Sequence, residues 1–283
     1  MKIVVTGYQG QLGTALTRQL GDEVVGVDLP VLDMIERDAV LQTLVALRPR
    51  AVIHTAAYTD AANAERQPKL CRAINVQGTG YVVEACVELD CPLLLASSTA
   101  VFGDPENESG YRESDPPSPR GTYAQSKYEA EQTVARWDKH FIVRSSGLYG
   151  PAGPRARRSF LYDMLQQAEE GQPLRLPADR CSSWTCTLDL ARALRFLIGT
   201  GAYGIYHVVN RGASSWYEFG CELFRLLDRD VTIEPQRGEE PPPAWGISRV
   251  VDTTKYHRLH GAPPMPTWQE ALARFLGEHV RAA

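Results

Sequence analysis

Residues 1–13 read MKIVVTGYQGQLG, an apolar run followed by a turn with glycines at positions 7, 10 and 13. A short β-branched run of this kind predicts a strand that is buried on both faces. A glycine turn has no Cβ atoms, so backbone N–H groups and the N-terminus of the next helix can approach a phosphate. The stretch therefore predicts a strand, a phosphate-binding turn at Gly7, Gly10 and Gly13, and a helix over 11–20.

Beyond this turn, short apolar runs alternate with longer helical patterns. The next predicted strands are EVVGVDL (23–29), AVIHTA (51–56), PLLLASS (92–98) and HFIVRSS (140–146), with helices over 35–47, 68–89 and 123–138. This βαβ alternation predicts an α/β fold of the Rossmann type, a doubly wound parallel sheet covered by helices on both faces.

The regular alternation fades after residue 150. The stretch PAGPRARR (151–158) precedes helical patterns near 159–170, 187–199, 214–228 and 267–280. We therefore expect residues 1–150 to form an NAD-binding Rossmann domain. Residues 151–283 are expected to form mainly a smaller C-terminal substrate-binding cap, with some segments returning to the Rossmann core.

The composition argues against several kinds of partner and site. With 30 basic and 34 acidic residues and a net charge of −4, the chain has no general basic field, so we expect neither nucleic acid nor an anionic membrane as a partner. The sequence has no signal-peptide pattern and no apolar stretch of membrane-spanning length, which predicts a cytoplasmic protein. Six cysteines without CxxC spacing and six scattered histidines predict free thiols and no metal site, with His54 as a core residue.

Asp28 ends the second predicted strand, at the position where a carboxylate accepts hydrogen bonds from the adenosine ribose of a dinucleotide. The residues after it are Leu29 and Pro30, so no adjacent Arg or Lys would neutralise a 2′-phosphate. These residues predict NAD as the cofactor in preference to NADP.

Tyr123 and Lys127 are spaced i, i+4, which places the phenol and the ammonium on one face of a helix. Ser98 closes the strand PLLLASS and therefore lies at the carboxyl edge of the sheet, where open α/β sheets bind ligands. Reduction of a ketone by hydride transfer needs an acid within reach of the developing alkoxide. We interpret Tyr123 as this acid/base, Lys127 as the group that tunes it and holds the nicotinamide ribose, and Ser98 with Thr99 as the groups that orient the substrate oxygen.

The motifs GYQGQLG (7–13), SSTAVFG (97–103) and YAQSK (123–127) resemble those of the extended short-chain dehydrogenase/reductase superfamily. The stretches HTAAYTDAANAE (54–65), IVRSSGLYG (142–150) and YGIYHVVNRGASSWYEF (203–219) narrow the resemblance to dTDP-4-dehydrorhamnose reductases and extend it over nearly the whole chain. The resemblance implies NAD(P)H-dependent reduction of the C4 ketone of a dTDP-linked 6-deoxy sugar, with a homodimer as the assembly.

Carried over by position, the resemblance places the catalytic Ser/Thr, Tyr and Lys on Ser98, Tyr123 and Lys127. It assigns the following residues to the cofactor site: Gly7, Gly10, Gln11, Leu12, Gly13, Ala56, Ala57, Tyr58 and Asn75. This sequence departs from the pattern of these reductases at positions on the substrate side. Gly147 stands in place of a tryptophan, and segment 179–185 reads DRCSSWT.

Arginines and tryptophans of the second half are the candidates for the substrate site. Arg155, Arg157 and Arg158 follow the last predicted strand and are expected to hold the diphosphate of a nucleotide-sugar, although a solvated basic turn is the competing interpretation. Trp184 and Trp216 are candidates to cover a base or a sugar ring, against the alternative that they pack in a core.

Two other functions stay open for this sequence. One is an NDP-sugar 4-epimerase that keeps NAD tightly bound and regenerates it in each turnover. The other is a non-catalytic regulatory subunit that binds a dinucleotide in order to stabilise a partner. The presence of Ser98, Tyr123 and Lys127 argues against the second function.

Overall fold

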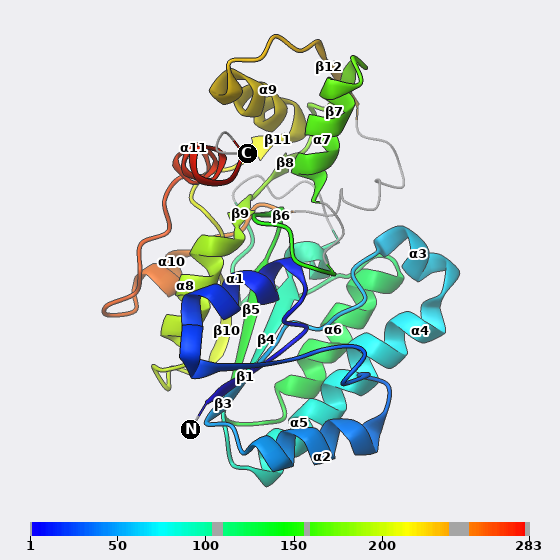
Figure 1. The fold of residues 1–283 in the computed structure, drawn as a ribbon, viewed down its shortest axis with the longest axis vertical. Helices are drawn as coiled ribbons and strands as arrows, with labels where there is room; N and C mark the ends of the chain where they lie inside the picture. The colour runs from blue at the N-terminus through cyan, green and yellow to red at the C-terminus, as the bar shows by residue number, and fades with distance from the viewer. Residues whose placement is uncertain (1, 104–109, 156–158, 238–248, 281–283) are drawn as a thin grey trace.

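The computed structural model describes residues 2–103, 110–155, 159–237 and 249–280. A parallel sheet of six strands in the order β2-β1-β3-β4-β5-β10 forms its centre (Figure 1). The strands are β1 (Ile3–Thr6), β2 (Val24–Val27), β3 (Ala51–His54), β4 (Leu93–Ser98), β5 (His140–Ser145) and β10 (Gly204–His207). The chain runs from β1 outward to β2 and then returns to β3 on the other side of β1. The strand order therefore reverses next to the glycine turn, and crevices at such switch points bind ligands.

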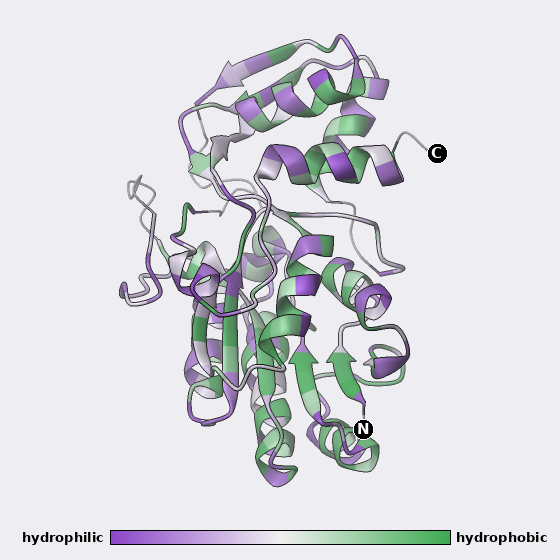
Figure 2. Ribbon diagram, turned by 90° about the vertical axis from the view of Figure 1, so that its left-hand side faces the viewer, coloured by the Kyte–Doolittle hydropathy of each residue, from purple (hydrophilic) through white to green (hydrophobic). Residues whose placement is uncertain are grey.

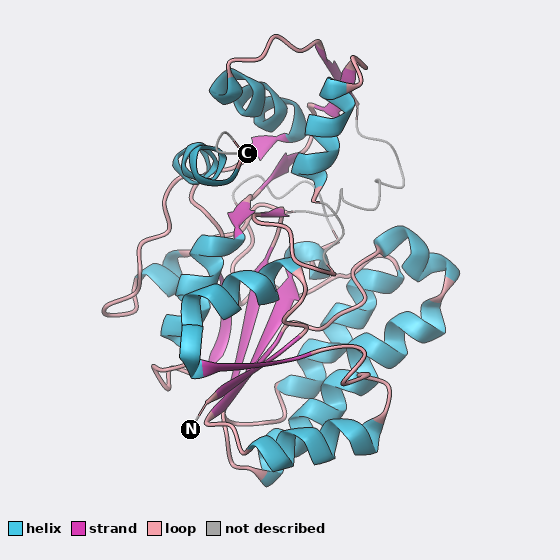
Figure 3. Ribbon diagram, viewed as in Figure 1, coloured by secondary structure: helices cyan, strands magenta, loops and turns pink. Residues whose placement is uncertain are grey.

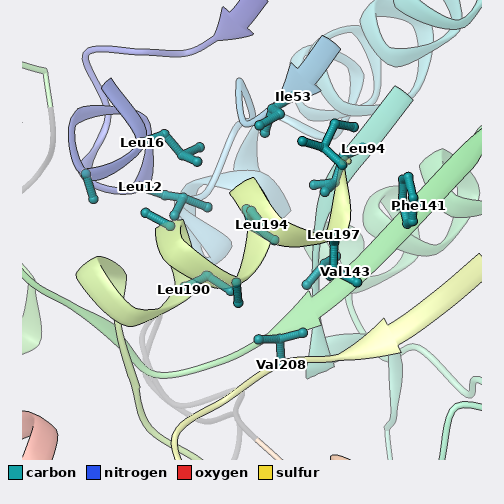
Figure 4. Packing of buried hydrophobic residues seen from close by; sticks show 14 of the residues in the cluster. Leu12, Leu16, Ile53, Leu94, Phe141, Val143, Leu190, Leu194, Leu197 and Val208 are labelled. Carbon is teal, nitrogen blue, oxygen red and sulfur yellow. The ribbon is translucent and has the colours of Figure 1, made fainter. Parts of the chain in front are cut away.

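Helices cover both faces of this sheet, which confirms the predicted α/β fold of the Rossmann type (Figure 3). One face carries α1 (Gln11–Leu20) and α8 (Thr187–Leu197), and the other carries α2 (Arg37–Leu47), α5 (Thr79–Glu88) and α6 (Thr122–Val134). The first face is closed by leucines of the two helices, which pack on apolar side chains of β3, β4 and β5 (Figure 4). Burial of each such leucine side chain stabilises the folded state by about 1.5–3 kcal/mol relative to leaving it exposed.

The hydropathy of each element matches its position in these layers (Figure 2). The central strands β1 and β3 are apolar except at their last residues, Thr6 and His54, because both of their faces are covered. Helix α1 instead buries Leu12, Leu16 and Leu20 at a spacing of four residues and exposes Arg18 and Gln19. This spacing gives the helix one apolar stripe that faces the sheet.

A second group of elements lies beyond the carboxyl ends of the strands, and we call it the cap (Figure 1). It consists of α7 (Phe160–Glu169), α9 (Trp216–Leu227), α11 (Trp268–His279) and the strand pairs β6 (Leu148–Tyr149) with β9 (Thr185–Cys186), β7 (Leu174–Pro177) with β12 (Ile233–Gln236), and β8 (Cys181–Ser182) with β11 (Ser214–Ser215). An aromatic core built on Trp184, Trp216 and Phe219 holds the cap together. Capping boxes at Ser215 and Thr267 fix the starts of α9 and α11.

The structure adds one strand to the predicted elements and divides one predicted helix. Strand β10 was not predicted, and it pairs with β5 at the edge of the sheet, so a segment from the second half of the chain completes the sheet. The predicted helix 68–89 is divided into α4 (Pro68–Arg72), a π-helical turn (Ala73–Gly78) and α5, and the Thr79 hydroxyl at the end of this turn donates a hydrogen bond of 2.6 Å to the Asn75 carbonyl oxygen. The remaining elements are η1 (Gly21–Glu23), α3 (Ala61–Arg66), η3 (Thr99–Val101) and α10 (Thr254–His257).

Several predictions about single residues are confirmed. All six cysteines are free thiols. His54 is a core residue with 1% of its surface exposed, and its Nδ1 lies 2.6 Å from the Thr6 hydroxyl oxygen.

No helix in the described ranges has the length and apolar composition needed to cross a bilayer.

Candidate active site

A cavity of about 460 Å³ opens at the carboxyl edge of the sheet. The residues singled out by the sequence that line it are Gly7, Gly10, Gln11, Leu12, Gly13, Asp28, Ala56, Ala57, Ser98, Tyr123, Lys127 and Arg155. The sequence did not point to Thr55, Ala96, Ser145 or Ser146, which also line the cavity. These four residues lie at or just after the ends of β3, β4 and β5, so strand ends were the signal that could have identified them.

The glycine turn leaves the N-terminus of α1 open to this cavity. Gly7 has φ +69°, and a Cβ on Gly13 would lie 2.2 Å from the Gly7 carbonyl oxygen. Only glycine allows the turn to pass so close to the start of the helix. Gly10 is the N-cap residue, and no side chain of the described residues caps the helix. Unsatisfied N–H groups and the positive end of the helix dipole therefore suit an anion such as a pyrophosphate.

Asp28 follows β2 at the rim of the same cavity. Its Oδ2 accepts a hydrogen bond of 3.2 Å from the Gln9 backbone N–H, and its Oδ1 accepts one of 2.9 Å from the Leu29 N–H. These two bonds fix the carboxylate in place. Its remaining lone pairs can accept hydrogen bonds from two ribose hydroxyls.

Ser98, Tyr123 and Lys127 come together at the other side of the cavity. Lys127 is 4% exposed, and its Nζ donates a hydrogen bond of 2.8 Å to the carbonyl oxygen of Ala96 in β4. Burial lowers the pKa of Lys127 to about 8, and the negative charge of Glu131 opposes this shift. Burial raises the pKa of Tyr123, whereas the nearby Ser98 hydroxyl lowers it. The phenol is therefore a protonated acid near neutral pH, held beside a second hydroxyl.

Glu65, at the end of α3, fixes the start of the helix that carries Tyr123. Its carboxylate accepts hydrogen bonds from the Thr122 backbone N–H at 2.6 Å and from the Thr122 hydroxyl at 2.8 Å. Helix α6 follows Gly121, which has φ +84° and no side chain of its own to act as a cap. Glu65, a residue of α3, thus acts as the N-terminal cap of α6. No local pattern in the sequence revealed its pairing with Thr122.

Substitution of Glu65 by Ala is expected to lower the free energy of unfolding by about 1 kcal/mol, the usual effect of losing an N-cap acceptor. Denaturant unfolding of the purified variant would measure the loss. Glu129→Ala is the matched control, because Glu129 lies on α6 and pairs with Arg72 on the surface. Exposed pairs contribute about 0.2–1 kcal/mol, so the control should lose less. Equal losses in the two variants would contradict the capping role.

A buried ion pair lies one helical turn from Lys127, behind the group of Ser98, Tyr123 and Lys127. Arg144 of β5 and Glu131 of α6 are 2% and 3% exposed. The Arg144 Nη2 donates to Glu131 Oε2 at 2.7 Å, its Nε donates to Oε1 at 3.0 Å, and the Ser97 hydroxyl also donates to Oε1. The pair joins α6 to β4 and β5 one helical turn below Lys127.

Asn75 and Tyr58 were predicted at the cofactor site, but neither lines the cavity. Asn75 is 2% exposed, and its Oδ1 accepts a hydrogen bond of 2.7 Å from the Tyr58 N–H. Its Nδ2 donates one of 2.8 Å to the Ser126 hydroxyl oxygen. Asn75 therefore joins the loop after β3 to α6, and its contact with the cofactor stays a prediction.

Thr99 and Trp184 were predicted to contact the substrate, and the structure places both side chains in buried positions, which for Trp184 is the competing interpretation of packing in a core. The Thr99 hydroxyl oxygen accepts the Arg249 backbone N–H at 3.3 Å. The Trp184 indole donates to the Ser214 hydroxyl oxygen at 2.8 Å within the cap core, where Trp216 is also buried. A Cβ on Gly147 would lie 2.7 Å from the Trp184 ring, so Trp184 fills the space that a tryptophan at 147 would need. Arg157 and Arg158 lie outside the described residues.

Comparison with known proteins places the chain among sugar-nucleotide reductases. A spore coat polysaccharide biosynthesis protein of Bacillus subtilis is 31% identical over 99% of both chains. A dTDP-4-dehydrorhamnose reductase of Streptomyces griseus is 32% identical over 95% of this chain and 91% of its own length. A solved dTDP-4-dehydrorhamnose reductase from Bacillus anthracis, in complex with NADP, has a TM-score of 0.91 and 34% identity over 98% of this chain and 100% of that one. The model of the RmlD substrate binding domain family matches residues 1–281, and the chain belongs to that family.

Proposed function

We propose that this protein reduces the 4-keto group of a nucleotide-linked 6-deoxy sugar with a nicotinamide dinucleotide as the reductant. The observation that carries the proposal is the single cavity shared by the glycine turn, Asp28 and the group of Ser98, Tyr123 and Lys127. Reductases named for dTDP-4-dehydrorhamnose are similar to the chain over nearly its whole length. The protein is thus an oxidoreductase that acts on a nucleotide-linked keto sugar.

The residues on one side of the cavity fit a dinucleotide. The open N-terminus of α1 suits the pyrophosphate, and the Asp28 carboxylate suits the adenosine ribose. Lys127 would hold the hydroxyls of the nicotinamide ribose with the ammonium protons that Ala96 does not accept. When bound, the reduced dinucleotide supplies the hydride for the reaction.

The chain's own residues supply the proton. The Tyr123 phenol is within reach of a carbonyl group that enters the cavity, and it gives its proton to the carbonyl oxygen as negative charge develops there. The Ser98 hydroxyl, which lies near the Tyr123 phenol, directs the same oxygen. The positive charge of Lys127 on the same helix face favours the phenolate that remains.

A direct test follows the absorbance of NADH in the presence of a panel of dTDP-linked 4-keto-6-deoxy sugars. We expect stoichiometric oxidation of NADH with at least one of them, and conversion of that ketone to an alcohol. An NDP-sugar 4-epimerase would interconvert two sugars without net change in NADH and would keep its cofactor through gel filtration. Constant absorbance with every ketosugar in the panel would overturn the proposed function.

We further propose that the protein prefers NADH to NADPH. The fixed carboxylate of Asp28 would repel a 2′-phosphate at the adenosine ribose. We expect kcat/KM to be about tenfold higher with NADH, a difference of roughly 1.4 kcal/mol. Asp28→Ser should reduce this ratio, and the exposed Asp22→Ser is the control with the same change in charge. A wild-type preference for NADPH would contradict the prediction.

A further inference from the structure

The segment that follows β6, residues 150–155, crosses directly over the glycine turn, and we call it the strap. The Gln11 side chain donates a hydrogen bond of 3.3 Å to the Gly150 carbonyl oxygen, and the Arg155 backbone N–H donates one of 3.1 Å to the Gln9 carbonyl oxygen. A Cβ on Gly153 would lie 2.3 Å from that same Gln9 oxygen. The strap is therefore in contact with the turn at three points along its length.

The strap carries the side chain of Arg155 to the dinucleotide side of the cavity. Arg155 lines the cavity and is exposed, and its guanidinium has no ion pair within the described residues. The other charged groups that line the described part of the cavity are Asp28 and Lys127. Since Lys127 is buried and bonded to Ala96, Arg155 is the cation in this lining that no described residue engages.

A pyrophosphate carries two negative charges, whereas a helix N-terminus offers only about half a positive charge. The turn region also contains the Asp28 carboxylate, and the chain as a whole is acidic. A neighbouring guanidinium supplies the missing positive charge and can donate two parallel hydrogen bonds to phosphate oxygens.

Resting on the proposed function, we propose that Arg155 binds the pyrophosphate of the dinucleotide cofactor from the cap side. The sequence had suggested the diphosphate of the sugar substrate instead. The position of the strap favours the cofactor, because Arg155 is bonded to Gln9, in the turn after β1. Ser98 ends β4, which is two strand spacings from β1, or about 10 Å across the sheet, and Tyr123 lies near Ser98 at the start of α6.

Binding of cofactor fragments to the sugar-free protein tests this assignment. ADP-ribose contains the pyrophosphate without the nicotinamide, whereas AMP lacks the pyrophosphate. In calorimetric titrations, we expect Arg155→Gln to lower the affinities for NADH and ADP-ribose by a similar factor, about tenfold or more. The affinities for AMP and dTDP should stay unchanged. Arg18→Gln, an exposed arginine on α1 with the same change in charge, should alter none of the four affinities.

Three results would overturn the assignment. Arg155→Gln with unchanged ADP-ribose affinity would show that the guanidinium is not bound to the pyrophosphate. If NADPH is titrated beside NADH, a loss of affinity confined to NADPH would show that Arg155 binds the 2′-phosphate. A loss of affinity confined to dTDP would show that it binds the diphosphate of the substrate. Failure of the proposed function is distinguishable from these results, because wild-type protein would then bind ADP-ribose and still reduce no ketosugar.

Discussion

Tyr123→Phe is expected to lower kcat for ketone reduction by about 10²- to 10⁴-fold, which is the usual contribution of a positioned general acid. The substitution removes one oxygen atom and keeps the aromatic ring, so the packing of α6 should stay intact. Because the lost proton acts only as charge develops on the carbonyl oxygen, binding of NADH and of the ketosugar should change little. Stopped-flow measurement of a single turnover would separate this chemical step from product release.

The neighbouring Tyr128→Phe provides the control for this experiment. Tyr128 lies on the same helix, and its ring packs against the cluster of Val101 and Phe102 outside the cavity. We expect its kcat to remain within about twofold of wild type, since it touches none of the reacting groups. Full activity in Tyr123→Phe would mean that another group donates the proton. Unchanged biological activity in that variant would favour the regulatory subunit over the enzyme.

Local patterns were enough to predict that the glycine turn and the group of Ser98, Tyr123 and Lys127 lie at the same edge of the sheet. The glycine spacing and the end of a strand are visible within a few residues, so Gly7, Gly13 and Asp28 could be placed from the sequence. The helical period likewise put Tyr123 and Lys127 on one face, and parallel strands bring their carboxyl ends to one edge. The structure gathers these residues around a single cavity.

Contacts between distant segments could not be predicted in the same way. Trp184 lies in the short polar connection between β8 and β9, and only the fold shows that it packs against Trp216 and Phe219. Glu65 and Thr122 are 57 residues apart, and their pairing depends on how α3 packs beside α6. Asn75 was assigned by resemblance to the cofactor, although its amide is fully engaged by Tyr58 and Ser126. When a side chain has several possible hydrogen-bond or packing partners, only the tertiary structure shows which of them it contacts.

Replacement of Arg144 by Met is expected to lower the free energy of unfolding by about 3–5 kcal/mol, which would be a large fraction of the stability of a typical domain. Methionine has a similar reach and no charge, so it leaves the buried Glu131 carboxylate with only the Ser97 hydroxyl as a hydrogen-bond partner in the described structure. Desolvation of an unpaired carboxylate, more than the loss of packing, causes the expected effect. Equilibrium unfolding in urea would measure it.

The double variant Arg144→Met with Glu131→Gln separates the cost of an unpaired charge from the contribution of the pair itself. A neutral amide at 131 still accepts the Ser97 hydroxyl through its oxygen, so we expect this variant to recover most of the stability lost in the single one. The exposed Arg72→Met, which removes the partner of Glu129, should lose less than about 1 kcal/mol. A double variant as unstable as Arg144→Met would show that the guanidinium stabilises the fold through packing on Phe102, whose ring centre lies 5.0 Å away, and not through neutralisation of Glu131.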